Sequence, residues 1–537
     1  MFENLSRNQR KDLEEALDRA HRRAQAPWSP SGWSNPLSSV VNRRAFLRGG
    51  AGLIGGAVLS KTLGGLSVAR VEAAQCAAVG SNVSPWGAIG PTLDPETGLN
   101  LLKLPSGFSY RSYGWTGDIM DDGLATPTPP LHDGMAVIQE LDRGHLLLVR
   151  NHEVDYDPEE PSNPPAFGDP SLAYDPLTGG GTANLIFDLA LGVFTSAAPS
   201  SSGHIRNCSG GVTPWGSWYT CEETDTGNTP AGGLRHGYVF EVGPLGPLPG
   251  GASIPFPDMG NFSHEATATD PATGITYLTE DGGSAEGDIG SGFYRFLYNV
   301  PGKAEHGGTL QMLAVRGQPQ IDFQETGCES QAFPVRWVTI ETPDPDVATG
   351  DPSTFQQGYA GGGANFRRLE GCWYGGASIF FVSTNGGPNI DPPNGTGTGE
   401  GQLYEYNPKS ETLRIRYVSP ARSALENPDN IVVAPDGSII FCEDNADGTG
   451  GVNPNEGERL VWLYPKTGQI FTFALNNMDF TSGGLGTLTR PSGRSFTANS
   501  KQNEWAGAVF SPDGKWLFVN IQTPGATFAI TGPWPWL

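Results

Sequence analysis

The sequence contains no apolar run long enough to cross a bilayer, and glycine and proline interrupt it throughout. The chain has 537 residues with 75 Gly and 45 Pro, together about 22% and nearly twice the usual share of about 12%. Because long helices tolerate neither residue, a mostly helical protein is excluded. The glycines follow no period of three, which excludes collagen. Aromatic residues make up 10% of the chain, enough to form a core and to argue against global disorder. What remains is a large all-β protein with many tight turns.

Basic residues are scarce outside the N-terminal region. The chain has 33 Lys+Arg against 57 Asp+Glu, a formal net charge of −24. Residues 1–74 hold 11 of the basic and 6 of the acidic residues, so the remainder carries a net charge of −29. A body this acidic repels a nucleic-acid backbone, and we expect no DNA or RNA partner. The acidity either maintains solubility or gathers carboxylates around metal ions.

Cysteine is also scarce, and several common catalytic motifs are missing. Six cysteines in a chain of this length do not form a disulfide scaffold, although some could pair in an oxidising compartment. The sequence has no standard mononuclear zinc spacing, no Gly-x-Ser-x-Gly elbow and no Gly-x-x-x-x-Gly-Lys phosphate loop. No serine or threonine stands out as a covalent nucleophile. These absences argue against the common serine-hydrolase and phosphate-loop enzymes.

The first 74 residues have the pattern of an export signal. A basic polar leader ends in the pair Arg43 and Arg44, which is followed by Phe-Leu and a Gly/Ala/Leu-rich stretch over residues 49–66. This stretch is too short and too weakly apolar for a membrane-spanning helix. Small residues before a cleavage point after Ala73 complete a resemblance to a twin-arginine (Tat) signal. We therefore expect recognition by the Tat export machinery, a periplasmic or secreted mature protein and no stable membrane insertion.

Many short segments of the remaining chain combine a turn with a strand. Pro-Asp-Gly turns at residues 434–437 and 511–514 each lead into a β-branched or aromatic run. Proline and glycine fix the turn, and the residues that follow suit a pleated, half-buried surface. Repeated hairpins that cannot bury their own apolar faces favour a β-propeller with long loop insertions, as at residues 155–181 and 386–401. A pair of β-sandwiches is the alternative architecture.

Polar residues gather where apparent strands end. Asn151 and Glu153 follow an apolar strand, and a Gly/Pro turn after Cys208 leads to a short aromatic strand that ends in Glu222 and Glu223. Two adjacent carboxylates repel each other unless a cation neutralises them, and successive strand residues face opposite ways. We therefore expect only one of the two in a site. A thiolate beside a carboxylate would suit iron, whereas a polar strand end in water and a buried apolar cysteine are the alternatives.

Further acidic strand ends occur in the second half of the chain. Hard oxygen ligands of the type that calcium prefers are offered by Glu265, Glu370, Asp429, Asn430, Glu443 and Glu504. In a propeller the corresponding strand ends converge on the central channel. Carboxylates brought together there would repel one another strongly unless cations were bound.

These motifs together resemble the PhoX-type alkaline phosphatases. The resemblance is carried by the export signal, Asn151 to Glu153, the block from Asn207 to Glu223, His264 to Ala266, Arg368 to Glu370, and the C-terminal Phe510 to Gly514. It implies a leader and Tat signal over residues 1–74, a linker over 75–94, and a single, six-bladed propeller domain over 95–537. It also implies hydrolysis of small-molecule phosphate monoesters outside the cytoplasm with ferric iron and calcium ions.

The resemblance further implies roles for individual residues. Arg368, Cys208 and Glu223 would be catalytic, and Arg368 and Asn151 would bind substrate. The expected metal ligands are Cys208, Glu223, Glu265, Glu370, Glu153, Asp429, Asn430, Glu443 and Glu504. Multivalent cations would offset both the acidic side chains and the dianionic substrate. Two other functions are open: a calcium-dependent propeller lactonase or phosphotriesterase, and a non-catalytic binding propeller.

Overall fold

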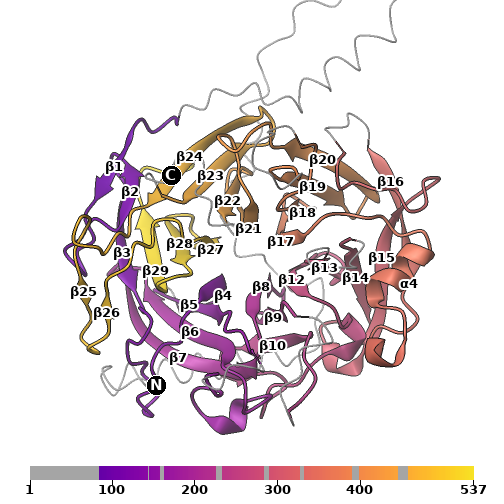
Figure 1. Cartoon of the computed structure of the whole chain (residues 1–537), viewed down its shortest axis with the longest axis horizontal. Coiled ribbons are helices and arrows are strands. Elements are labelled where there is room, and N and C mark those ends of the chain that lie inside the picture. Colours follow the sequence, from indigo (N-terminus) through magenta and orange to yellow (C-terminus); the bar gives the residue numbers. More distant parts are fainter. Residues whose placement is uncertain are drawn as a thin grey trace, which may run out of the picture.

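The β-sheets of the molecule are arranged around a central axis, as in a β-propeller (Figure 1). The computed structural model describes residues 84–142, 144–157, 163–224, 233–282, 290–326, 332–389, 398–444 and 457–537. The expected leader and export signal lie outside these ranges. Within them, α4 (Thr354–Ala360) is the one α-helix, and no helix is both long enough and apolar enough to span a bilayer. The expectation of an all-β, propeller-like protein is confirmed.

Most strands belong to four-stranded antiparallel units. The first unit is β4 (His132–Asp142), β5 (His145–His152), β6 (Gly180–Asp188) and β7 (Val193–His204). The second is β8 (Asn207–Val212), β9 (Trp218–Glu222), β10 (Val239–Gly243) and β11 (Gly246–Pro247). Another comprises β27 (Trp505–Phe510), β28 (Trp516–Ile521), β29 (Ala526–Thr531) and the early strand β3 (Ser109–Tyr113).

Two larger sheets contain the remaining units. One joins β12 (His264–Thr269), β13 (Thr276–Glu280), β14 (Phe293–Tyr298) and β15 (Gly308–Val315), through β16 (Phe333–Thr339), to β20 (Thr412–Val418), β19 (Gln402–Asn407), β18 (Ser378–Ser383) and β17 (Leu369–Gly375). The other extends β21 (Pro428–Val433), β22 (Ile439–Glu443), β23 (Arg459–Tyr464) and β24 (Gln469–Asn476) with β2 (Leu102–Pro105) and β1 (Ile89–Thr92).

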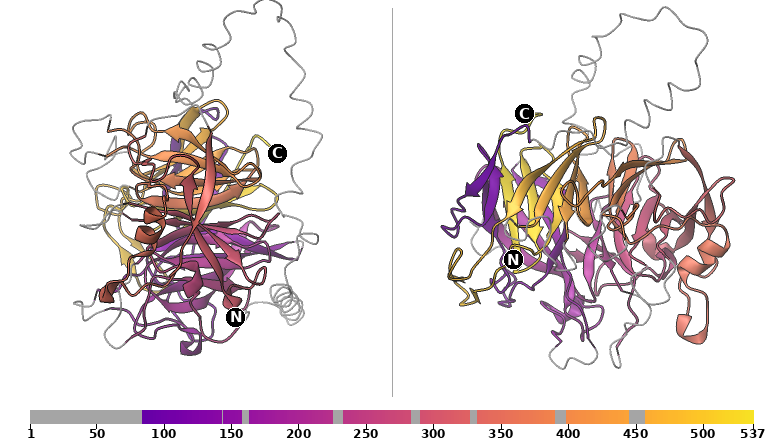
Figure 2. Two further views of the ribbon diagram at one scale, coloured as in Figure 1. Left: turned by 90° about the vertical axis from the view of Figure 1, so that its right-hand side faces the viewer. Right: turned by 45° about the horizontal axis from the view of Figure 1, so that its top comes forward.

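The remaining elements are short. They are the hairpin of β25 (Leu488–Thr489) and β26 (Ser495–Phe496) and the short 3-10 helices η2 (Pro170–Leu172), η3 (Pro257–Met259), η4 (Ala304–His306) and η5 (Val347–Thr349). Helix α4 lies at the outer edge of the molecule in Figure 1 and in the right-hand view of Figure 2. None of these elements supplies a side chain to the site described below.

An early strand and the last strand of the chain lie side by side in one sheet. Strand β3 pairs with β29, with Thr527 opposite Tyr113, so an early segment completes the sheet formed by the C-terminal strands. Strand β1 pairs with β2 and lies inside the segment 75–94 that was expected as a linker. The folded sheet thus begins before residue 95.

The predicted turns connect the strands on either side of them. Gly437 donates its N–H to the carbonyl of Ala434 (2.9 Å) in the turn between β21 and β22, and Gly514 donates to Ser511 (2.8 Å) between β27 and β28. Both glycines have positive φ, 86° and 69°, the conformation that glycine adopts most readily. These sequence-based turn assignments are confirmed.

Aromatic packing fills the space between neighbouring four-stranded units. Phe293 on β14 stacks on Phe381 on β18, with ring centroids 4.1 Å apart, and both side chains are fully buried. On the other side of the molecule Trp462 on β23 packs against Trp534. Burying a phenylalanine side chain contributes on the order of 2 to 3 kcal/mol, so these contacts help hold adjacent units at a fixed distance.

Six strands, β4, β8, β12, β17, β21 and β27, surround the axis and are called the inner strands (Figure 1). Each contacts the next, and β27 contacts β4, so that they form a closed ring. Glycines permit the close approach. A Cβ on Gly211 would lie 2.1 Å from the Thr267 carbonyl oxygen, and one on Gly371 would lie 2.6 Å from that of Asp429. Any larger residue there would push two inner strands apart.

All six inner strands carry a register shift close to their first residue. The shifts lie between residues 132 and 135, 207 and 210, 264 and 267, 369 and 372, 428 and 431, and 506 and 509. A β-bulge of this kind turns the bulged side chain away from its alternating position. The bulges therefore determine which side chains face the axis.

Candidate metal centre

The bulges of five inner strands present acidic or thiol side chains. The first residue of each bulge is Asp133, Cys208, Glu265, Glu370 or Asp429. In β27 the shift lies one residue later, and Glu504, just before that strand, joins the group instead. Equivalent places in five of the repeated units thus supply side chains that can bind a metal ion.

The residue that follows the second strand of a unit adds another set of acids. Glu153, Glu223, Asp281 and Asp444 each donate their backbone N–H to the residue just before the inner strand of the same unit, at 2.9 to 3.0 Å. This hydrogen bond ties the end of the second strand to the beginning of the inner strand. It therefore fixes the second set of carboxylates beside the first.

We call these ten residues the axial cluster: Asp133, Glu153, Cys208, Glu223, Glu265, Asp281, Glu370, Asp429, Asp444 and Glu504. Four groups of three within it have ligand atoms that all lie within 4.8 Å of one another. They are Cys208/Glu223/Glu265, Asp133/Glu153/Glu504, Glu265/Glu370/Asp429 and Asp429/Asp444/Glu504. Because Glu265, Asp429 and Glu504 each belong to two groups, the four groups form one continuous chain.

The electrostatics of the cluster strongly disfavour ionised carboxylates. Burial raises the pKa of Glu265 well above its usual range, and the charges of Asp429 and Glu370 raise it further. Burial and the nearby Asp444 raise the pKa of Asp429 to about 8. Burial and the charge of Glu265 likewise raise the pKa of the Cys208 thiol. A bound cation would reverse these shifts, because it favours the charged forms.

Two arginines form ion pairs with the cluster. Arg206 Nη2 lies 2.8 Å from Glu223 Oε2 and 3.6 Å from Glu153 Oε1. Arg368 Nη2 lies 2.9 Å from Asp281 Oδ2 and 3.0 Å from a Glu370 oxygen. Nine carboxylates thus face two guanidinium groups, and the pairs cannot neutralise the cluster.

The donor set fits the metals that the sequence analysis expected. The group containing Cys208 combines a thiol with two carboxylates, which suits iron, and the other three groups contain carboxylates alone, which suit calcium. Among the described residues, Glu265 Oε1 and Asp133 Oδ1 are buried and have no hydrogen-bond partner. Buried oxygens are rarely left in this state, and both are positioned to bind a cation.

The structure brings seven of the nine expected metal ligands together: Cys208, Glu223, Glu265, Glu370, Glu153, Asp429 and Glu504. Asn430 lies beside them, but its Nδ2 donates to Asp429 Oδ1 (2.7 Å) and its Oδ1 accepts from the Gly507 N–H (2.7 Å). Its amide therefore orients Asp429 and links two inner strands.

Glu443 lies apart from the four groups. Both of its carboxylate oxygens accept hydrogen bonds from Arg459, each at 2.6 Å, and Oε1 also accepts the N–H of Glu426. Strand alternation places Glu443 on the opposite side from its neighbour Asp444. The sequence-based choice of Glu443 as a ligand differs from this arrangement, in which Asp444 faces the axis.

Asn151, expected to bind substrate, is fully buried and bonded within the protein. Its Nδ2 donates to the carbonyls of Cys208 (3.3 Å) and Ser209 (2.7 Å), and its Oδ1 accepts from Trp218 and Thr220. These contacts hold the bulge that presents Cys208. The geometry gives Asn151 a positioning role in place of a substrate contact.

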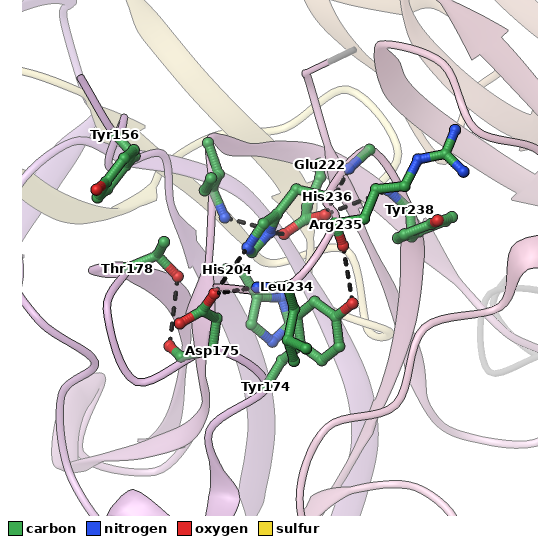
Figure 3. A network of polar contacts seen from close by, with 12 residues as sticks. Tyr156, Tyr174, Asp175, Thr178, His204, Glu222, Leu234, Arg235, His236 and Tyr238 are labelled. Atoms are coloured by element: carbon green, nitrogen blue, oxygen red, sulfur yellow. Dashed lines mark hydrogen bonds and ion pairs between the residues drawn. The ribbon is translucent and has the colours of Figure 1, made fainter. Parts of the chain in front are cut away.

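Glu222 faces away from the cluster into a buried polar network (Figure 3). Its Oε1 lies 2.6 Å from His236 Nδ1, and its oxygens accept the N–H groups of Ile205 and Gly237, both at 2.9 Å. His236 Nε2 lies 3.7 Å from Asp175 Oδ2. The expectation that only one carboxylate of the Glu222–Glu223 pair points into the site agrees with this arrangement.

Four residues of the site were not chosen from the sequence: Asp133, Asp281, Asp444 and Arg206. Three of them have the same signal, because Asp133 occupies the bulge position, and Asp281 and Asp444 occupy the place after the second strand. Aligning the repeated units with one another would have found them. Arg206 stands two residues before Cys208, as Arg368 stands two residues before Glu370.

The chain matches a known protein family and is similar to several solved structures. A protein-family model described as alkaline phosphatase PhoX matches residues 85–187 and 192–525. Among solved structures, Pseudomonas fluorescens PhoX in complex with vanadate, a transition state analogue, is similar at 15% identity and a TM-score of 0.52, covering 83% of this chain and 97% of that chain. A gluconolactonase from Xanthomonas campestris is similar at 10% identity and a TM-score of 0.34, covering 84% of this chain and 100% of that chain. No curated protein matches the chain at a significant level.

Proposed function

Because the chain belongs to the PhoX alkaline phosphatase family, we propose that it hydrolyses phosphate monoesters and releases inorganic phosphate at the axial cluster. The single observation that carries this proposal is the set of eight carboxylates and one thiol, buried or half-buried, that form four triads of metal-binding size. Such a group requires multivalent cations, and cations in such a site bind phosphate oxygens. Ferric iron at the Cys208 group and calcium at the carboxylate groups match the donor atoms.

We also infer that the propeller has six blades. The support is the closed ring of six inner strands, each with a register shift near its first residue. In addition, the residue after the second strand donates its N–H to the residue before the inner strand in all six units. Six equivalent units around one axis would place the cluster at the centre of the molecule.

The bound metals would supply positive charge for phosphate oxygens and a polarised water for attack on phosphorus. The remaining roles fall to the chain itself. Arg368 is held by Asp281 and Glu370, and its Nη1 takes part in no hydrogen bond or ion pair with a described residue. This nitrogen can donate to a phosphate oxygen, and the planar guanidinium would keep that oxygen in a fixed direction.

The surrounding protein keeps the ligands in place and excludes water. Cys208 is 4% exposed and its thiol donates to the carbonyls of His264 and Glu265, both at 3.4 Å. Asn151 holds the backbone of the same bulge. A rigid, dry ligand set of this kind strengthens every electrostatic interaction with the phosphoryl group.

The direct test is turnover of p-nitrophenyl phosphate by the purified mature protein at alkaline pH. We expect release of phosphate that requires calcium and an iron content that survives purification. Full activity after complete removal of both metals would overturn the proposal. We further propose Tat-dependent export to the periplasm or medium, which replacement of Arg43 and Arg44 by lysine should block.

One alternative enzyme is favoured by a specific observation. Three of the four groups contain carboxylates alone, as a calcium-dependent lactonase or phosphotriesterase would need. The variant Cys208→Ala separates the two functions. A phosphatase that uses iron would lose iron and activity, whereas a calcium-only hydrolase would keep its metal content and its activity on lactones or phosphotriesters.

A further inference from the structure

We propose that Arg206 is a second phosphate-binding residue, acting with Arg368, and that it gives the site its preference for dianionic over monoanionic phosphates. This inference rests on the proposed phosphatase function and extends it to a residue that the sequence analysis did not select. It is carried by the equivalent positions of the two arginines, by their shared neighbour Glu223 and by their exposure.

The two arginines occupy the same place in two repeated units. Each stands two residues before the first bulged residue of an inner strand, and each accepts at its carbonyl the N–H of the residue that follows the second strand. Both have left-handed backbones, with φ of 49° for Arg206 and 39° for Arg368. Leu131 and Asn427 have the same backbone conformation at the same place in their units. This conformation is therefore a property of the fold, and the guanidinium groups distinguish the two arginines from the other residues at this place.

The charge of Glu223 acts on both guanidinium groups. Arg206 Nη2 forms an ion pair with it at 2.8 Å. Burial lowers the pKa of Arg368, but the charges of Glu370 and Asp281 raise it more, and the charge of Glu223 makes a smaller contribution to the rise. The two cations therefore lie within electrostatic range of one carboxylate of the iron-type group. A phosphate held over that group would be attracted by both positive charges.

Both arginines are also partly accessible. The side chain of Arg206 is 36% exposed and that of Arg368 is 25% exposed, whereas that of Glu223 is only 10% exposed. Among the described residues, Arg206 uses Nη2 for its ion pairs, and its Nε and Nη1 form no hydrogen bond. Two donors of the planar fork remain for an oxyanion.

The chemistry of the substrate explains why a second arginine would matter. A phosphate monoester at alkaline pH carries two negative charges on three non-bridging oxygens, whereas a diester carries one charge on two. Arginine binds phosphate through paired, charge-assisted hydrogen bonds that are about twice as strong as neutral ones. A second guanidinium group therefore strengthens the binding of a dianion more than the binding of a monoanion.

The alternative is that Arg206 has a structural role and does not contact phosphate. Its charge could serve only to hold Glu223 and Glu153 in place for the metal. Removal of Arg206 would then disturb the metal site, and the loss would be the same for every anion. Metal content and anion selectivity thus distinguish the two roles.

The experiment uses the metal-loaded full-length mature protein with Arg206→Gln and Arg206→Lys, and with Arg316→Gln as a matched control from a surface ion pair with Glu411. The readouts are metal content, kcat/KM for p-nitrophenyl phosphate, and the inhibition constants of inorganic phosphate and dimethyl phosphate. We expect Arg206→Gln to weaken phosphate inhibition about 10- to 100-fold, the range for loss of charged hydrogen bonds, and dimethyl phosphate inhibition several-fold less. Metal content should be unchanged, and Arg206→Lys should be intermediate.

Two results would overturn the proposal. One is loss of metal from Arg206→Gln, and the other is an equal change in the two inhibition constants. Should the wild-type protein hydrolyse no ester, the proposed function fails, and calorimetric titration with inorganic phosphate then decides the role of Arg206. Weaker phosphate binding by Arg206→Gln than by the wild type supports it, and equal or absent binding in both contradicts it.

Discussion

Glu222 and Glu223 are neighbours in the chain and differ in almost everything that determines what a carboxylate does. Burial favours a higher pKa for Glu222, but the charge and hydrogen bond of His236 outweigh it, and the pKa ends below its usual value. Burial raises the pKa of Glu223 well above its usual value, and the charges of Asp281 and Glu153 add to the rise, although Arg206 acts against it. Two adjacent residues at one strand end thus lie in two different environments.

The difference lies in whether the protein completes the environment of the charge. The network around Glu222 contains its own cation, because burial lowers the pKa of His236 but the charge of Glu222 raises it more, and backbone N–H groups satisfy the oxygens. The axial cluster has far too few cations of its own. A buried carboxylate with its partners is part of the scaffold, whereas a buried carboxylate without them indicates a site for an external cation.

The largest expected effect follows from removing the charge that faces the axis. Glu223→Gln should lower kcat for p-nitrophenyl phosphate at least 100-fold, the order of loss when a group that stabilises transition-state charge is removed. It should also reduce bound iron. The metal-free form should be no less stable than the wild type, because one of several repelling carboxylates has gone. Steady-state kinetics and elemental analysis measure the first two effects, and urea unfolding of the chelated protein measures the third.

The matched change on the other side of the strand should have the opposite profile. Glu222→Gln removes the nearer of the two carboxylates beside the buried His236, at 2.6 Å against 3.7 Å for Asp175, and breaking a buried charge pair costs about 3 to 5 kcal/mol. The free energy of unfolding, with and without metal, should fall by this amount. Glu411→Gln is the control, since its pair with Arg316 is exposed and contributes about 0 to 1 kcal/mol. An unchanged unfolding free energy for Glu222→Gln would remove the distinction between the two neighbours.

A smaller effect should appear in the pH dependence of stability. The raised pKa values of Asp133, Glu265, Glu504 and Asp429 (about 8) mean that the folded, metal-free chain holds these protons more tightly than the unfolded chain. Their contribution to stability is therefore complete below the unfolded values near pH 4 and is lost as the pH rises to 8 and beyond. Chelated protein should become less stable from pH 5 to pH 8.

Calcium-loaded protein should lose much less stability over the same pH range, because bound cations favour the ionised carboxylates. His236 also has a raised pKa, so its contribution is lost as the pH rises from about 6.5. This contribution is lost with or without metal. The difference between the stability curves of the chelated and the calcium-loaded protein therefore reports on the axial cluster alone. Parallel curves for chelated and loaded protein would show that the cluster binds no calcium.

The fold and much of the site were accessible from the sequence because they depend on local patterns. Turn residues and alternating strands predicted an all-β propeller, and acidic strand ends predicted the approximate positions of most residues of the axial cluster. Strand ends do not by themselves show which of two adjacent acidic residues faces the axis. Glu223 and Asp444 hold equivalent places, each one residue beyond the last paired residue of its second strand. The strand pattern alone nevertheless favours Glu443, because it does not fix the register of one repeat against another.

Asp133 and Arg206 were missed for a different reason. Both depend on the corner and bulge at the beginning of an inner strand, where the backbone departs from simple alternation. No residue type marks a bulge in isolation, and the glycine at position 134 is needed only because Ser209 of the next inner strand lies 2.6 Å from where its Cβ would be. That constraint arises between strands about 75 residues apart and becomes visible only when the ring closes.

The central claim is that multivalent cations make the axial cluster possible. The most direct measurement is elemental analysis of the purified mature wild-type protein beside Glu222→Gln and Glu223→Gln. The account predicts iron and more than one calcium ion per chain in the wild type and in Glu222→Gln, and a lower iron content in Glu223→Gln. A wild-type protein that is folded and hydrolyses phosphate monoesters while holding no stoichiometric metal would contradict it.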